Sequence, residues 1–173
     1  MNKIAVITGG TGGIGQAVAE RLAREKQTVG ILDINDEAGA KVAAEFRKRG
    51  IPVAFLRVDV TQESEVQSAF DKIKAEHGNI DVLVNVAGGS MHRHLLDEFP
   101  LAQWQAVIDA NLTSTFLCCR AAIPIMKTQK AGSIVNISSD IAFSGDSSRS
   151  AYAAAKGALI ALAPRSRRSC FRV

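Results

Sequence analysis

A tyrosine and a lysine stand four residues apart in an alanine-rich segment. Tyr152 and Lys156 lie in AYAAAKGALIAL, which predicts a helix, so their side chains share one helix face. A nearby ammonium favours a phenolate over a phenol, and such a tyrosine can exchange protons with an alcohol or a carbonyl. Taken alone, a Tyr-x-x-x-Lys pair is common by chance and is usually a surface pair.

Two serines end the apolar run that precedes this helix. Ser138 and Ser139 close the segment VNISS, which predicts the end of a strand. In doubly wound folds, ligands bind at the carboxyl edge of the sheet. We therefore expect this strand to deliver both serines to the edge where the tyrosine lies, and we expect Asp140 and Asp146 to cap the intervening loops.

Short runs rich in valine and isoleucine alternate with segments of helical spacing. Each run is expected to form a strand buried on both faces. The alternation predicts a Rossmann-type α/β fold, a three-layer, doubly wound parallel sheet. The expected strands are residues 4–8, 29–33, 53–58, 81–85 and 133–138, and the expected inward helical stripes are Ile14, Val18 and Leu22; Ala38, Val42 and Phe46; Val66, Phe70 and Ile73; and Trp104, Val107, Ile108 and Leu112.

A glycine-rich segment, TGGTGGIG, separates the first strand from the first helix. It fits G-x-G-x-x-G through Gly10, Gly12 and Gly15, and T-G-x-x-x-G-x-G through Thr8, Gly9, Gly13 and Gly15. A strand, a tight glycine turn and a helix N-terminus place backbone N–H groups against a diphosphate. No Gly-Lys-Ser/Thr follows, which disfavours a phosphate loop of the NTPase kind.

An aspartate ends the second expected strand. Asp33 can accept hydrogen bonds from both ribose hydroxyls of an adenosine, and it would repel a 2′-phosphate. Neither Ile34 nor Asn35 is cationic, and the glycine loop holds no Lys or Arg, so NAD is favoured over NADP. The alternative role, an N-cap for the next helix, is compatible with this one.

The net charge of +4 comes from the end of the chain, where Arg165, Arg167, Arg168 and Arg172 lie. We expect residues 1–162 to form one dinucleotide-binding domain that carries the catalytic residues, and residues 163–173 to be a basic, disordered or aberrant tail. Nucleic-acid binding through this tail is the least favoured alternative, because no nucleic-acid-binding signature accompanies it.

The cysteines and histidines show neither disulfide nor metal-ligand spacing. Cys118 and Cys119 are adjacent, and Cys170 lies in the tail. His92 and His94 have no supporting ligand nearby, so we expect no metal site, although either can line a substrate pocket. No segment approaches membrane-spanning length, and the N-terminal apolar run is too short for a signal peptide. These features predict a cytoplasmic protein that does not act at a membrane.

Several motifs, in order and from Lys3 to about Leu162, resemble the classical short-chain dehydrogenase/reductase family. The matching positions are the glycine loop at residues 8–15; Asp59 and Val60; Asn85, Val86, Ala87 and Gly88, where the family has Asn-Asn-Ala-Gly; Asn111; and Ser139, Tyr152 and Lys156. Valine at the second position of the Asn-Asn-Ala-Gly motif is a departure from the family pattern. Ser139 matches the catalytic serine of the family better than Ser138 does.

The resemblance implies an oxidoreductase that transfers a hydride between NAD(H) and a secondary alcohol or ketone. It implies that Tyr152 is the acid/base, that Ser139 hydrogen-bonds the substrate oxygen, that Lys156 supports the phenolate and grips the nicotinamide ribose, and that Asn111 holds a water in a proton relay. The implied cofactor-binding residues are Gly9, Thr11, Gly13, Ile14, Gly15, Asp33, Asp59, Val60, Asn85, Ala87, Gly88, Tyr152 and Lys156.

The resemblance also implies a homodimer or homotetramer. The stripes from Trp104 to Phe116 and from Ala151 to Leu162 are candidates for the subunit interface, with core packing as the other role for Trp104 and Phe116. A small-molecule alcohol or ketone is the expected partner, and neither nucleic acid nor a membrane is expected.

The family fold continues beyond the helix of Tyr152 with further strands and a mobile segment that closes over substrate. Here Pro164 and an Arg/Ser-rich end follow, so we expect the last strands to be missing and the fifth strand to form an apolar edge. One hypothesis is a frame-shifted or prematurely terminated product, and the less favoured one is a natural short variant with a different role. The alternative function is a catalytically impaired, NAD-binding fragment.

Overall fold

In the computed structural model of the chain, residues 3–25 and 27–162 are described, so the predicted tail at 163–173 lies outside the described residues. The elements alternate as the sequence predicts. In order they are β1 (Ile4–Thr8), α1 (Gly13–Arg24), β2 (Thr28–Asp33), α2 (Asp36–Lys48), β3 (Val53–Arg57), α3 (Glu63–His77), β4 (Val82–Asn85), the 3₁₀ turn η1 (Leu96–Glu98), α4 (Leu101–Ile108), the π-helical turn η2 (Asp109–Thr113), α5 (Ser114–Gln129), β5 (Ser133–Asn136), α6 (Ile141–Ser144) and α7 (Ser150–Leu162).

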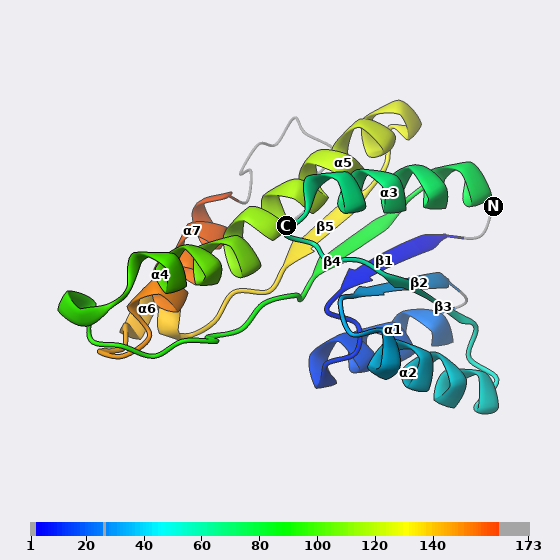
Figure 1. Ribbon diagram of the computed structural model, residues 1–173. Helices are drawn as coiled ribbons and strands as arrows, with labels where there is room; N and C mark the ends of the chain where they lie inside the picture. The colour runs from blue at the N-terminus through cyan, green and yellow to red at the C-terminus, as the bar shows by residue number, and fades with distance from the viewer. Residues whose placement is uncertain (1–2, 26, 163–173) are drawn as a thin grey trace.

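The five strands form one parallel sheet in the order β3-β2-β1-β4-β5. Helices α1 and α2 lie on one side of the sheet, and α3 and α5 lie on the other (Figure 1). The strand order reverses direction between β1 and β4, which is where doubly wound sheets form a crevice at their carboxyl edge. The predicted three-layer, Rossmann-type fold is confirmed.

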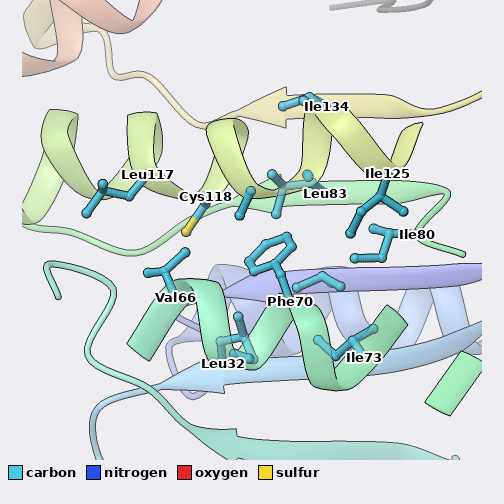
Figure 2. Close-up of a cluster of buried hydrophobic side chains, with 14 of the residues drawn as sticks. Leu32, Val66, Phe70, Ile73, Ile80, Leu83, Leu117, Cys118, Ile125 and Ile134 are labelled. Carbon is cyan, nitrogen blue, oxygen red and sulfur yellow. The ribbon is translucent and has the colours of Figure 1, made fainter. Parts of the chain in front are cut away.

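The larger core fills the space between the sheet and helices α3 and α5. Phe70 of α3 is fully buried and lies among side chains of β4 and α5 (Figure 2). The predicted stripe of Val66, Phe70 and Ile73 is buried along its whole length. A second core, between the sheet and helices α1 and α2, includes Phe46. The two cores hold the carboxyl ends of the strands in fixed positions.

The prediction that every strand is buried on both faces is wrong for the two edge strands. In β3 no position is fully buried, and Ala54 and Arg57 are exposed; in β5, Val135 is 39% exposed. Helix α5 covers the neighbouring Ile134 on one face, but α1 and α2 pack over the β1 side of the other face. Both strands are also shorter than predicted, because β3 ends at Arg57 and β5 ends at Asn136.

Two side chains assigned to inward helical stripes are exposed instead. Ile14, 57% exposed, stands in the first turn of α1 and lines the cleft described below. Phe116 is 44% exposed, and the guanidinium of Arg120 lies over its ring at 5.2 Å. Trp104 is half-buried and contacts Phe99 edge to face. Helical spacing shows which residues share a helix face, but it does not show whether other elements cover that face.

The stretch Leu101–Gln129, which joins α4, η2 and α5, is continuous over 29 residues and reaches a mean hydropathy of 1.2. By length and composition it is apolar enough to cross a membrane, so the expectation that no segment approaches this length is wrong. Its apolar side chains have a packing explanation, since Leu117, Cys118 and Ile125 belong to the core against α3. Figure 1 shows α5 lying beside α3 over the sheet.

Two adjacent cysteines of α5 allow a test of this packing. Burial raises the pKa of the Cys118 thiol to about 12 and that of Cys119 to about 11. With these pKa values both thiols are protonated near neutral pH, and a protonated thiol reacts slowly because the thiolate is the reactive form. In a Cys170→Ser background, we expect the folded protein to react with a thiol reagent at least about tenfold more slowly than the unfolded protein. Equal rates would contradict the burial of these side chains.

Candidate active site

A cleft of about 920 Å³ opens at the carboxyl edge of the sheet, between the glycine loop and α7. Most of the predicted site residues line it, from segments far apart in the sequence. They are Gly9, Thr11, Gly13, Ile14, Asp33, Asp59, Val60, Ala87, Gly88, Ser139, Tyr152 and Lys156. Gly15, Asn85 and Asn111 are not among the lining residues, and each has a different position in the structure.

The glycine loop has the backbone geometry that a diphosphate site needs. Gly9 has φ +65°, and a Cβ there would lie 2.8 Å from backbone atoms of Ala87. A Cβ on Gly15 would collide with the Gly9 carbonyl, so Gly15 lets α1 pack closely under the loop. No side chain in the described part of the chain caps α1, and no acidic residue stands in its first turn. Its first residues, Gly13 and Ile14, line the cleft, so this helix N-terminus suits an anionic group.

Asp33 is held by the glycine loop. Its Oδ2 accepts hydrogen bonds from the Thr11 N–H at 3.0 Å and from the Thr11 hydroxyl at 2.7 Å, and its Oδ1 accepts one from the Asn35 N–H. The N-cap of α2 is Asn35, whose side chain accepts from the Ala38 N–H. The alternative role for Asp33, as a helix cap, is therefore wrong. Its Oδ1 retains acceptor capacity toward the cleft.

The segment after β3 forms the side wall of the cleft at Asp59 and Val60. The Asp59 carboxylate accepts hydrogen bonds from the backbone N–H and the hydroxyl of Thr61. The backbone N–H of Asp59 donates to the Glu65 carboxylate at 2.8 Å. Glu65 also pairs with Arg57 at the end of β3. These bonds fix the turn that carries the two predicted residues.

Asn85 connects two strands and lies outside the cleft. It is buried, and its Nδ2 donates to Asn136 Oδ1 at 2.9 Å, across the β4–β5 pair. The N–H groups of Val86 and Ala87 donate to the Thr8 hydroxyl at 3.1 and 3.2 Å. Thr8 was not among the predicted site residues. Its position at the end of β1, at the carboxyl edge of the sheet, could have identified it as a candidate. It ties the first strand to the Val-Ala-Gly turn.

Asn111 lies in the π-helical turn η2 and is fully buried. Its Nδ2 donates to the carbonyls of Gly89 and Val107, both at 2.9 Å, and its Oδ1 accepts from the Gly89 N–H at 3.0 Å. The side chain thus fixes the turn that follows Gly88. These bonds use three of the four hydrogen-bonding capacities of the amide. Its role in a proton relay stays a prediction.

Tyr152, Lys156 and Ser139 all line the cleft. The Lys156 Nζ lies 5.6 Å from the centre of the Tyr152 ring and donates to the Ile137 carbonyl at 2.8 Å. Lys156 is only 4% exposed, and burial lowers the pKa of its ammonium. The Ser139 hydroxyl donates to Asp140 Oδ1 at 3.0 Å. A hydroxyl, a phenol and an ammonium thus share one site with the glycine loop.

The loop before α7 is held by ion pairing. The Arg149 guanidinium, together with the backbone and hydroxyl of Ser148, holds the pKa of the Asp146 carboxyl well below its usual range. Asp140 caps α6 through the Ile141 N–H. The expected capping roles of both aspartates are confirmed.

The histidines lie outside the cleft. His94 bonds Gln103 through Nε2 at 2.7 Å and contacts Phe99, and neither His92 nor His94 lines the cleft. Within residues 3–25 and 27–162, no group of three or more metal-ligating side chains comes together. The possibility that either histidine lines a substrate pocket finds no support in the lining of the cleft.

Comparison with known proteins gives the same reading of this geometry. Residues 3–170 match the family model described as short chain dehydrogenase. The chain is 40% identical over 160 residues to the 3beta-hydroxysteroid dehydrogenase of Mediterraneibacter gnavus, covering 92% of this chain and 58% of that protein. It is 40% identical over 161 residues to a 3-oxoacyl-[acyl-carrier-protein] reductase of Chlamydia muridarum, covering 92% of this chain and 64% of that protein.

A solved structure shares the fold. The crystal structure of NAD+-bound xylitol dehydrogenase superposes with a TM-score of 0.89 at 35% identity, covering 93% of this chain and 62% of the other. The chain thus spans about three fifths of the length of the proteins it matches. With the family model matching nearly its whole length, the chain belongs to the short-chain dehydrogenase family.

Proposed function

We propose that the protein is an NAD(H)-dependent oxidoreductase that interconverts a secondary alcohol and a ketone. One observation supports this above all others. The glycine loop and the group Ser139, Tyr152 and Lys156 line the same cleft, although more than a hundred residues separate them in the sequence. A dinucleotide held by the loop would therefore extend toward the phenol.

The residues present fit a dinucleotide. The uncapped N-terminus of α1 suits the diphosphate, and a Cβ built on Gly13 would meet open space beyond its own helix and chain neighbours, which leaves room for a phosphate. Asp33 would accept from the adenosine ribose, with Asp59 and Val60 beside the adenine. When bound, the nicotinamide group supplies hydride transfer, which no side chain can perform.

The side chains of Tyr152, Lys156 and Ser139 would handle the proton and the developing charge. The Tyr152 Oη takes a proton from the alcohol or returns one to the carbonyl oxygen. The Lys156 Nζ, 5.6 Å from the centre of the Tyr152 ring, would stand beside the charge that forms on the phenol during the transfer. The Ser139 hydroxyl, after turning from Asp140, donates to the substrate oxygen.

The substrate class follows from this proton chemistry and from the relatives. One relative is named for a hydroxysteroid and another for a 3-oxoacyl group. The first name indicates an alcohol substrate and the second a ketone substrate. A panel of secondary alcohols and ketones, assayed with both nicotinamide cofactors, tests the proposal. Turnover of at least one pair with NAD(H) supports it. NADH binding without any turnover would support the alternative, a catalytically impaired NAD-binding protein.

Asp33→Asn is expected to weaken the preference for NAD over NADP by about tenfold. The neutral amide no longer repels a 2′-phosphate, and the ribose loses a charge-assisted hydrogen bond. The ratio of kcat/KM with the two cofactors measures this change. Asp36→Asn, at the first position of α2, is the control and should leave the ratio unchanged. A ratio unchanged in Asp33→Asn would contradict the ribose contact.

A further inference from the structure

The exit from β5 and helix α7 exchange two hydrogen bonds at adjacent residues. The Ser138 hydroxyl donates to the backbone carbonyl of Lys156 at 2.7 Å. In the opposite direction, the Lys156 Nζ donates to the backbone carbonyl of Ile137 at 2.8 Å. The main chain of Lys156 is thus bonded to Ser138, and its side chain is bonded to the preceding residue, Ile137. We call this pair of bonds the β5–α7 clamp.

The clamp is connected to the centre of the sheet. The Ile137 N–H donates to the Asn85 carbonyl at 3.0 Å, which continues the β4–β5 ladder beyond the last residue of β5. Ile137 therefore has a fixed position relative to the buried strands, and Lys156 takes its position from Ile137 and Ser138. The Tyr152 ring, one helical turn before Lys156, follows the same frame.

We propose that Ser138 is a positioning residue that fixes the rotation of α7 and so sets how closely the Lys156 ammonium approaches the Tyr152 phenol. Its role differs from that proposed for Ser139. The hydroxyl of Ser138 acts through the backbone of Lys156, whereas that of Ser139 is available to the substrate. The catalytic consequence rests on the proposed function, but the positioning does not.

Apolar packing alone holds α7 weakly against rotation. Two of its fully buried side chains, Ala151 and Ala155, are single methyl groups, and Leu159 is the larger buried anchor. Methyl groups bury little area and leave a smooth surface against α4, α6 and η2. Hydrogen bonds depend on direction as well as distance, so the clamp supplies the missing rotational restraint.

Several charged groups lie near the phenol, and none of them is altered by a change at Ser138. Lys156 is on the same helix, and Arg149 precedes it. The Arg149 guanidinium has a raised pKa, chiefly from its bond to Asp146, with smaller effects from Asp140 and Tyr152. Asp109, in the π-helical turn, lines the same cleft. A change in the surroundings of the Tyr152 ring in a Ser138 variant therefore reports the placement of Lys156.

The experiment uses the fact that Tyr152 is the only tyrosine in the chain. With isotope-labelled tyrosine, the NMR signals of the ring, recorded without cofactor, report on this side chain alone. In Ser138→Ala we expect these signals to shift, because the ring and the Lys156 side chain no longer hold the same relative position. Ser138→Thr, which keeps the hydroxyl, is expected to restore the wild-type signals.

A matched control removes a similar bond elsewhere. The buried Ser114 hydroxyl donates to the Ala110 carbonyl at 2.8 Å, within the stretch that joins η2 and α5. Ser114→Ala is expected to lower stability without moving the Tyr152 ring signals. Unchanged ring signals in Ser138→Ala, or the same shift in Ser114→Ala, would overturn the proposal. If Ser138→Ala does not fold, Ser138→Cys, with its weaker donor, is expected to give a smaller shift in the same direction.

Turnover separates this inference from the proposed function. Where an alcohol substrate is found, Ser138→Ala is expected to lower kcat by up to about tenfold, the size of one neutral hydrogen bond, with a smaller change in the KM for NAD. A wild-type protein that turns over no substrate refutes the proposed function. The NMR comparison of the Tyr152 ring still decides the role of Ser138 in that case.

Discussion

Replacing Tyr152 with phenylalanine is expected to lower the turnover of a secondary alcohol by about a thousandfold while NADH binding is retained. The variant loses only the hydroxyl, so the ring still fills its place beside the Lys156 side chain. General acid/base groups contribute about a hundredfold to ten-thousandfold, and no other phenol exists in the chain to replace this one. Initial rates and NADH fluorescence, measured on the same preparations, test both halves of the prediction.

Turnover and NADH binding together separate a catalytic role of Tyr152 from a structural one. A loss of turnover with unchanged NADH binding assigns the proton transfer to Tyr152. Retention of a tenth or more of the wild-type rate, as an order of magnitude, would remove Tyr152 from that role. Loss of both activity and binding would instead indicate that α7 had shifted. The thermal midpoint of unfolding of the variant distinguishes that case from a specific loss.

The fold was accessible from the sequence because its signals are local. Buried parallel strands are apolar along their whole length, and the run at β1 is buried at every position, as predicted. The pattern carries no information on which strand lies at an edge. β5 lies at an edge of the sheet, as expected, and the exposure of Val135 follows from that position in the strand order and not from the run itself.

The predicted site residues fall into two groups for a physical reason. Motif residues expected to contact a ligand, such as Gly13 and Tyr152, line the cleft. Their sequence spacing places them on the segments that follow the carboxyl ends of the strands. Asn85 and Asn111 lie outside it, bonded to Asn136 and Gly89. A motif identifies a residue but does not separate contact with a ligand from support of the backbone that makes the contact.

The two neighbouring serines illustrate what spacing omits. Both hydroxyls reach the carboxyl edge of the sheet, as expected, and both line the cleft. Their partners differ, since Ser138 bonds the main chain of α7 and Ser139 bonds Asp140. The sequence favoured Ser139 by its distance from Tyr152 alone. The bond from Ser138 depends on how α7 packs against the sheet, which no local pattern encodes.

Ser139→Ala is expected to lower kcat by about a hundredfold, with little change in NADH binding. A hydroxyl that donates to the substrate oxygen stabilises the charge that develops there, and the loss of one such donor typically costs about a hundredfold to a thousandfold. Steady-state rates with the best substrate of the panel measure the effect. Ser144→Ala is the control, because its hydroxyl donates to backbone carbonyls of Asp140 and Gly145 at the far end of α6.

A second variant decides whether Ser139 acts on the substrate or only on the start of α6. In the structure its hydroxyl donates to Asp140, and its oxygen lies 3.4 Å from the Ile141 N–H. Asp140→Ala removes that acceptor and the helix cap but keeps the serine. If Ser139 donates to the substrate, Asp140→Ala retains most of the turnover, since the freed hydroxyl turns toward the cleft. Equal losses in the two variants would show that the serine works through α6, and the proposed role for Ser139 would fail.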